Sequence, residues 1–263
     1  MASSRVGGLL REWRQRRRLS QLDLALAAGT SARHLSYVET GRAKPSRAMV
    51  LRLCEALDVP LRERNTVLLA ADYAPAYQES SLDDENLAAA RSAWETMLAT
   101  HEPYPAVVVD RMWNVVAGNS AMHVLTDGVH AHLLDGQPNV YRLVLHPEGL
   151  SGRLVNAHQV RERFLERLAR QVSATGDTRL RDLYDEVSAY PLPETTDTET
   201  GLERSGPFQF PVRVRTPAGE IAMFSTMATF GAPADVTLSE LAIELFYPLD
   251  EFTAAVLRAA AGR

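Results

Sequence analysis

Residues 29–46 read GTSARHLSYVETGRAKPS and place a short helix directly after a turn. Gly29 is expected to end the preceding helix, because a sharp turn there needs the left-handed backbone that glycine adopts without cost. Thr30 or Ser31 can then cap a new helix over residues 32–39 by accepting hydrogen bonds from its first free backbone amides. The stretch therefore predicts two helices joined by a tight turn, the second about two turns long.

Apolar residues at helical spacing predict four further helices around this stretch. They span about residues 6–18, 21–28, 46–57 and 61–71. Ser20 is the expected cap of the second of these, while Gly41 and Pro45 break the chain before the third. The first 72 residues are thus predicted to form a five-helix domain, with Leu35 and Val38 facing its core.

Charge is unevenly spread along the chain. The 263 residues include 28 Lys and Arg against 33 Asp and Glu, a net charge of −5. Residues 1–72 hold 13 basic and 7 acidic side chains, net +6, so the remainder holds 15 and 26, net −11. A basic first domain joined to an acidic remainder suits a protein that meets a polyanion through one end only.

The composition indicates an ordinary globular protein of two domains, with 46% apolar and 23% charged residues. Cys54 is the one cysteine, which excludes an intramolecular disulfide, and its apolar neighbours indicate a small buried side chain. The N-terminus lacks the apolar core of a secretory signal, and no run approaches the ~18 apolar residues that span a membrane. A cytoplasmic protein without a membrane partner is expected.

The spacing of eight residues resembles the helix-turn-helix of the XRE, or phage-repressor, family over residues 5–72. These are Gln21, Leu24, Ala25, Gly29, Leu35, Val38, Glu39 and Gly41. The resemblance implies that the third helix enters the major groove of double-stranded DNA, and that Arg14 pairs with Glu39 inside the domain. One small module gives too little specificity against a genome, so a homodimer on a palindromic operator is expected.

The side chains expected to meet DNA fall into two groups. Those assigned to base edges are Ser31, Ala32, Arg33 and Tyr37, with His34 as a further candidate. Those assigned to phosphates are Gln21, Arg42 and Lys44. Among the residues assigned to base edges, Arg33 is the one side chain that offers the bidentate contact to guanine. Ala32 stands where relatives often carry a polar reader, which limits it to contact with a thymine methyl group.

Residues 73–83 are rich in Pro, Ser and acidic residues and read as a linker, after which the pattern alternates between helices and strands. Helices are expected over residues 84–100, 119–125, 139–145, 156–174, 179–189 and 250–261, and strands over 106–110, 113–117, 208–215 and 220–230, with a polar loop at 192–206. Residues 235–251 fit a capped helix or a strand. The strand is chosen, because two front and three back strands then close one antiparallel sheet.

Two strands, several helices and three strands follow one another in the order of a PAS-like domain. Three segments resemble the ligand-binding domain of MmyB-like transcription regulators: PAVVVDRMWNVVAGNSA (105–121), HPEGL (146–150) and TFGAPADVTLSELAIELFYPLDE (229–251). The expected fold class is α plus α/β, with two domains. A five-helix XRE-type helix-turn-helix domain (1–72) is joined by the linker (73–83) to a PAS-like domain (84–263) with an antiparallel sheet flanked by helices.

The second resemblance implies a sensor of a hydrophobic small molecule, with fatty-acid-like compounds as candidates. Apolar side chains that could contact it are Trp113, Val115, Met122, Phe164, Phe208, Val212, Met223 and Phe224. The same side chains would also serve an ordinary core, because pockets and cores draw on the same residue types. The alternative is therefore a domain that only dimerises or binds proteins and takes no ligand.

A metal site is the one catalytic feature that the sequence suggests. His130 and His132 lie near Asp127 and Asp135, and His146 or His158 could join them. His-x-His without a second ligand pair is a weak signal, and in a loop it is usually solvated. The chain also lacks a nucleophile motif, a Gly-rich phosphate loop and a cysteine cluster. We expect no enzymatic activity, no metal, and no cofactor other than a bound fatty acid or similar apolar ligand.

Overall fold

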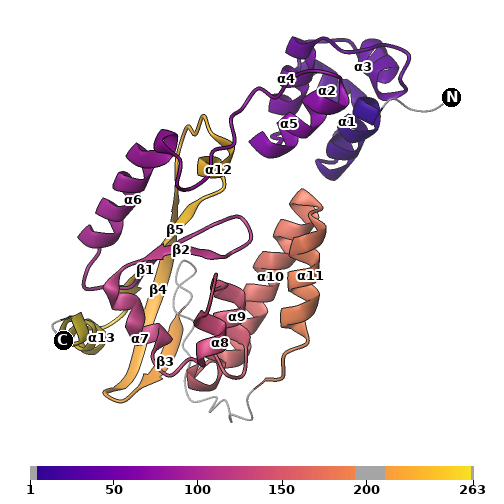
Figure 1. Cartoon of the computed structure of the whole chain (residues 1–263). Coiled ribbons are helices and arrows are strands. Elements are labelled where there is room, and N and C mark those ends of the chain that lie inside the picture. The colour runs from indigo at the N-terminus through magenta and orange to yellow at the C-terminus, as the bar shows by residue number, and fades with distance from the viewer. Residues whose placement is uncertain (1–4, 193–210, 262–263) are drawn as a thin grey trace. The chain divides into compact units, whose positions relative to one another are not determined.

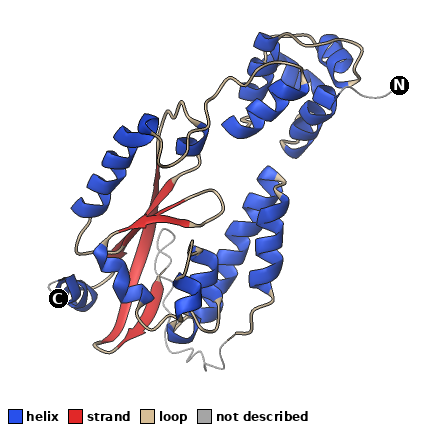
Figure 2. Cartoon of the chain, in the orientation of Figure 1, coloured by secondary structure: helices blue, strands red, loops and turns tan. Residues whose placement is uncertain are grey.

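The computed structural model of the chain describes residues 5–192 and 211–261. Internal contacts divide the chain into two units, whose elements are labelled in Figure 1 and coloured by type in Figure 2. The N-terminal unit comprises Met1–Asn86 and Ala232–Ser239, and the C-terminal unit comprises Leu87–Gly231 and Glu240–Arg263.

The first part of the N-terminal unit is the predicted five-helix domain. Its helices are α1 (Arg5–Arg16), α2 (Gln21–Ala27), α3 (Ala32–Glu39), α4 (Arg47–Ala56) and α5 (Leu61–Ala70). The side chains of Ser20, Ser31 and Ser46 cap α2, α3 and α4 by accepting from backbone amides of the first turn. Gly29 and Gly41 follow α2 and α3 with φ of +62° and +75°, the left-handed backbone that was expected there. The helix-turn-helix prediction is confirmed.

The C-terminal unit is built on an antiparallel sheet with strand order β2-β1-β5-β4-β3 among the described residues. The strands are β1 (Ala106–Val109), β2 (Val115–Gly118), β3 (Val212–Thr216), β4 (Gly219–Thr229) and β5 (Ala242–Pro248). Ser225 of β4 lies opposite Phe246 of β5. Because successive side chains of a strand point to opposite faces, Glu244 lies on the same face as Phe246 and Ser225. The PAS-like arrangement is confirmed.

Helices lie on both sides of this sheet (Figure 1). They are α6 (Ala88–Thr100), α7 (His123–Thr126), α8 (Ala131–Leu134), α9 (Val140–Leu145), α10 (Ala157–Thr175), α11 (Thr178–Ser188) and α13 (Glu251–Ala261), with short 3-10 turns at Glu85–Leu87, Ser120–Met122 and Ser151–Arg153. All four residues of β1 are buried, as expected of a β-branched run covered on both faces. Within the described ranges, none of the helices has the length and apolar character that crossing a membrane requires.

The connection between β4 and β5 belongs to the N-terminal unit. Its helix α12 (Val236–Ser239) packs against α5. The backbone N–H of Val236 donates to the carbonyl of Gln78 (2.8 Å), and the N–H of Ser80 donates to the carboxylate of Asp235 (3.0 Å). The segment that follows α5 is thereby paired with a piece of chain more than 150 residues away.

Residues 235–251 combine both alternatives that the sequence left open. The strand prediction is confirmed for β5, but a single helical turn, α12, precedes it. Asp235 caps this turn by accepting a hydrogen bond from the N–H of Leu238 (3.2 Å). The predicted strand over 208–215 begins outside the described residues, and the described part starts at Val212.

Candidate functional site

The exposed face of α3 carries the side chains expected to read bases. Ser31 caps the helix by accepting from the N–H of His34 (3.1 Å). Arg33 Nε donates to the Tyr37 hydroxyl (3.0 Å), and the guanidinium lies 5.5 Å from the tyrosine ring centroid. Ala32 and His34 are half-buried, and Ala32 packs against the core. Exposed Arg33 in the first turn of α3 and half-buried Tyr37 one turn later thus form one joined surface.

A buried carboxylate anchors α3 to the rest of its domain. Glu39, 3% exposed, accepts two hydrogen bonds from the Arg14 guanidinium (2.7 and 2.9 Å) and one from the Gln21 side-chain amide (2.9 Å). Burial acts to raise the pKa of Glu39, but the hydrogen bonds from Arg14 and Gln21 outweigh it and hold the pKa below its ordinary value. The predicted pair between Arg14 and Glu39 is confirmed, and it fixes α3 against α1.

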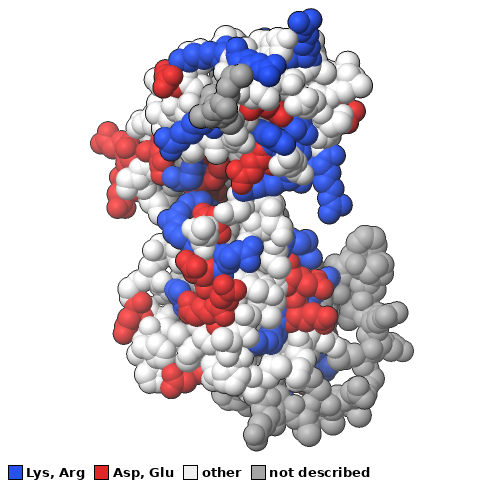
Figure 3. Space-filling view, turned by 90° about the vertical axis from the view of Figure 1, so that its right-hand side faces the viewer, with Lys and Arg blue, Asp and Glu red and all other residues white. Residues whose placement is uncertain are grey.

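The three side chains assigned to phosphates differ in their exposure and in their bonds within the protein. Gln21 is engaged with Glu39, so a phosphate contact through its amide nitrogen would compete with that bond. Arg42 and Lys44 are exposed in the loop between α3 and α4, and Lys44 Nζ pairs with Asp72 (2.8 Å). Figure 3 shows Lys and Arg side chains, in blue, spread over the N-terminal unit. Contact with phosphate stays a prediction for these three residues.

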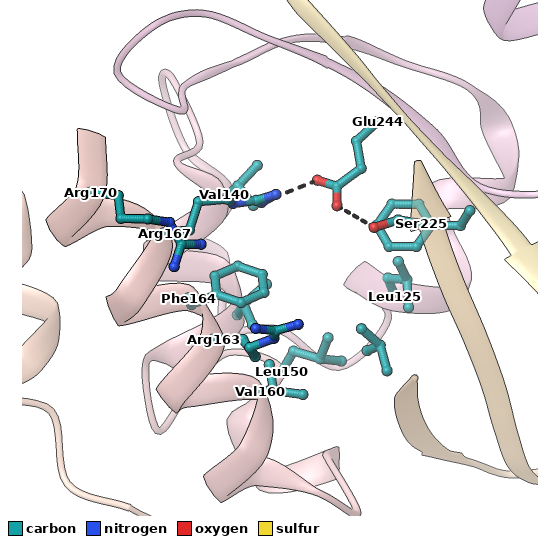
Figure 4. Close-up of a pocket in the computed structure, with 13 residues that line it drawn as sticks. Leu125, Val140, Leu150, Val160, Arg163, Phe164, Arg167, Arg170, Ser225 and Glu244 are labelled. Atoms are coloured by element: carbon teal, nitrogen blue, oxygen red, sulfur yellow. Dashed lines mark hydrogen bonds and ion pairs between the residues drawn. The ribbon is translucent and has the colours of Figure 1, made fainter. Parts of the chain in front are cut away.

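A cavity of about 300 Å³ lies between α10 and the sheet of the C-terminal unit (Figure 4). Its apolar wall is formed by Leu125, Val140, Val144, Leu150, Val160 and Phe164. A smaller space of about 60 Å³ shares with it Leu125, Val140, Val144, Leu150, Glu244 and Phe246. The shared lining makes the two spaces one candidate ligand site with mainly apolar walls.

Charged side chains also line this cavity. Glu244 is 4% exposed and accepts a hydrogen bond from the Ser225 hydroxyl (2.7 Å). Its second carboxylate oxygen lies 3.9 Å from the guanidinium of Arg167, which covers the ring of Trp113 at 4.2 Å. Arg163 and Arg170 lie about one turn to either side on α10 and line the cavity as well (Figure 4). The site therefore offers positive groups to an acidic ligand and holds one internal carboxylate.

The predicted ligand residues fall in several places. Phe164 and Val212 line the larger space, and Val115 and Met122 line the smaller one. Trp113 and Met223 are buried in the neighbouring core, whereas Phe224 stacks on Tyr247 with ring centroids 5.2 Å apart. Phe208 lies outside the described residues. The structure gathers four of the eight around one site, and contact with a ligand stays a prediction for all of them.

The sequence search for apolar residues missed the charged members of this site. Arg163, Arg167 and Arg170 are spaced to share one face of a helix, which was a usable signal. Glu244 interrupts the apolar residues of the predicted strand, and a carboxylate that is buried there needs partners. Both signals lie in side chains that sequence patterns usually assign to solvent.

Two family models match the chain. Residues 90–260 match the MmyB-like transcription regulator ligand binding domain, and residues 5–67 match a helix-turn-helix domain. The first match covers more than half of the chain. Neither of these two models describes an enzyme.

The curated relatives and one solved structure match about a quarter of the chain, and a second solved structure matches most of it at low identity. HTH-type transcriptional regulators of Mycobacterium bovis and Mycobacterium tuberculosis are 36% identical over 72 residues, 27% of this chain and 28% of their own length. The crystal structure of the restriction-modification controller protein C.AhdI from Aeromonas hydrophila is 36% identical over 23% of this chain and 92% of that chain, with a TM-score of 0.23. An RNA-binding light-oxygen-voltage receptor is 16% identical over 98% of this chain and 62% of that chain, with a TM-score of 0.29.

Proposed function

This chain belongs to the family of MmyB-like transcription regulators, and from that premise we propose that it binds a DNA operator through α3 and senses an apolar small molecule through its C-terminal unit. One observation carries the sensing proposal: the family's ligand-binding domain contains a cavity with apolar walls and arginine side chains along its lining. Binding of the molecule changes the affinity for DNA. The protein acts as a homodimer in the cytoplasm.

The α3 surface supports the DNA proposal. Helices of this kind place their N-terminal residues against base edges in the major groove. Arg33 lies exposed in the first turn of α3, and half-buried Tyr37 lies one turn later. The bond between these two side chains holds the guanidinium in a defined direction before DNA is met, which lowers the entropic cost of contact. Two such helices in a homodimer would read half-sites about one helical turn apart on a palindromic operator.

The cavity supports a ligand with an apolar body and an acidic end, of which a fatty acid is the simplest example. Side chains such as Leu125, Val160 and Phe164 suit an alkyl chain. Arg163, Arg167 and Arg170 suit a carboxylate, because a charge-assisted bond to a guanidinium is stronger than a neutral one. The cavity volume of about 300 Å³ is at the lower end of the range for small-molecule sites.

Arg167 also supports a route from ligand to DNA. Its guanidinium lies near Glu244 of β5 and contacts Met227 Sδ of β4 (3.3 Å). These two strands run into the connection that packs within the N-terminal unit. A ligand that draws Arg167 away from Glu244 would therefore change contacts of the strands that bear this connection. The ligand can shift the affinity for DNA only by the difference between its affinities for the two arrangements of the protein, with Arg167 near Glu244 and with Arg167 drawn away.

Arg33→Ala is expected to weaken binding to the preferred operator about tenfold or more, because one good bidentate base contact is worth about 1–3 kcal/mol. Affinity for random duplexes should change much less. Fluorescence anisotropy with an operator selected from a random duplex pool, and with random DNA, measures both. Lys44→Ala is the matched comparison and should weaken both duplexes alike. Unchanged discrimination in Arg33→Ala would mean that α3 is not docked as proposed.

Val144→Trp is expected to weaken binding of dansyl-labelled undecanoic acid about tenfold, because the larger side chain occupies space that both parts of the cavity share. Dansyl fluorescence during titration of the whole chain gives the affinity. Leu134→Trp serves as control, since Leu134 is exposed and lies outside the lining. Wild-type protein that neither binds the probe nor carries a lipid in native mass spectrometry would favour the alternative, a dimerisation or protein-interaction scaffold without ligand.

A further inference from the structure

Three exposed side chains of the C-terminal unit bring potential metal ligands together, away from the residues that line the cavity. His130 precedes α8, His132 lies in its first turn, and Glu148 lies in the turn that follows α9. Their ligand atoms all lie within 4.8 Å of one another. The Nδ1 atoms of the two histidines are 2.8 Å apart, and His132 Nδ1 is 3.7 Å from a carboxylate oxygen of Glu148. The sequence suggested Asp127, Asp135, His146 and His158 as companions of the His-x-His pair, whereas the fold brings Glu148 to it as the third ligand.

The backbone holds these two segments in place. The N–H of His130 donates to the carbonyl of Glu148 (3.0 Å), which joins the start of α8 directly to the turn. The turn is closed by the N–H of Leu150, which donates to the carbonyl of Leu143 (2.8 Å). A Cβ on Gly149 would lie 2.3 Å from that same carbonyl oxygen, so only glycine fits there. The backbone positions of His130 and Glu148 are therefore held next to each other by the main chain.

The two Nδ1 atoms are at hydrogen-bond distance, and a divalent cation can take the place of that bond once the two rings move slightly apart. One proton between two Nδ1 atoms satisfies that pair and leaves the carboxylate to solvent. A tetrahedral zinc ion with bonds of about 2.0–2.2 Å holds its ligand atoms about 3.3–3.6 Å apart. The 3.7 Å between His132 Nδ1 and Glu148 is close to this spacing, whereas the two Nδ1 atoms, 2.8 Å apart, must separate to reach it. Two imidazoles and one carboxylate are also a donor set that zinc accepts, with the fourth position left to water.

We propose that His130, His132 and Glu148 form a binding site for one zinc ion. The ion replaces the hydrogen bond between the two histidines and ties α8 to the turn after α9. Val144 and Leu150, which lie on either side of Glu148 in sequence, line the apolar cavity. Zinc binding is thus expected to stabilise one wall of that cavity. The site stands on its own geometry and does not depend on the proposed ligand or on DNA binding.

Isothermal titration of the tag-free whole chain with zinc, after treatment with a chelator, tests the site. One ion per chain is expected to bind with micromolar or tighter affinity, and to raise the thermal midpoint because it binds only the folded chain. His132→Ala and Glu148→Gln should each weaken binding at least tenfold, in line with ~10–100-fold losses seen even for outer-shell changes.

Matched controls separate this site from general surface binding. His158→Ala and Asp135→Asn remove an exposed histidine and an exposed acid outside the cluster and should leave zinc affinity unchanged. The proposal is overturned if the wild type binds no zinc at 50 times the protein concentration. It is equally overturned if His132→Ala and Glu148→Gln bind as tightly as the controls.

Discussion

Replacing Glu39 by alanine is expected to lower the free energy of unfolding of the helix-turn-helix domain by about 3–5 kcal/mol, the usual cost of removing one partner of a buried ion pair. The change leaves the guanidinium of Arg14, whose side chain is 12% exposed, without its carboxylate. It also removes the acceptor of the Gln21 amide. Chemical denaturation of the whole chain, with hydrogen exchange of the α3 amides as the local probe, measures the loss.

Two variants make this result specific. Glu12→Ala removes the carboxylate that pairs with Arg16, but the Glu12 side chain is 55% exposed, and such surface pairs contribute about 0–1 kcal/mol. The double change Arg14→Met with Glu39→Leu removes both charges and should be more stable than either single variant. A loss in Glu39→Ala no larger than that in Glu12→Ala would contradict the anchoring role.

The same pair makes the domain sensitive to acid. The folded pKa of Glu39 is held below its unfolded value by Arg14 and Gln21, in spite of burial. The stability that the carboxylate contributes is therefore fully present above the unfolded pKa. It is lost as the pH falls through the folded pKa, because protonation removes the charge that Arg14 requires.

Affinity for duplex DNA is expected to fall about a thousandfold between 50 and 200 mM salt, if a dimer neutralises about six phosphates and releases their counterions. The physical reason is that the positive charge is concentrated in residues 1–72, while the chain as a whole carries −5. A plot of log affinity against log salt, from anisotropy titrations at four salt concentrations, should be linear and steep.

Single-charge variants test which cations take part. Arg42→Gln should make the salt slope shallower by about one unit for each phosphate contact that it removes. Arg91→Gln, in α6 of the C-terminal unit, is the matched control and should leave the slope unchanged. A shallow slope in the wild type would contradict DNA binding through a basic surface, whatever the affinity at low salt.

Local chemistry explains why the helix-turn-helix domain was predictable. Ser20, Ser31 and Gly29 act through hydrogen bonds and backbone conformations that involve only their near neighbours. The helix bounds of α2 and α3 accordingly agree with the expected ranges to within a residue. Sequence patterns of this kind predict the secondary structure that a short segment adopts through local interactions.

The cavity was less predictable because it depends on contacts between distant segments. Glu244 and Ser225 meet only once the β4–β5 register is set, and Arg167 reaches them from a helix more than 50 residues earlier. Phe224 points to the face of β4 opposite to that of Ser225, which lines the cavity. A shift of one residue in the strand register would have exchanged the residues that face the cavity with those that face away from it. Which strand residues face the cavity is therefore decided by tertiary structure and not by the local sequence.

The connection between β4 and β5 changes how the chain can be divided. The main chain passes from one unit to the other after Asn86, and again on either side of residues 232–239. A fragment ending at residue 86 would keep the five helices but lose the partners of Gln78 and Ser80. A cut in the first crossing alone would leave these hydrogen bonds, together with the packing of α12 on α5, as links between the two pieces.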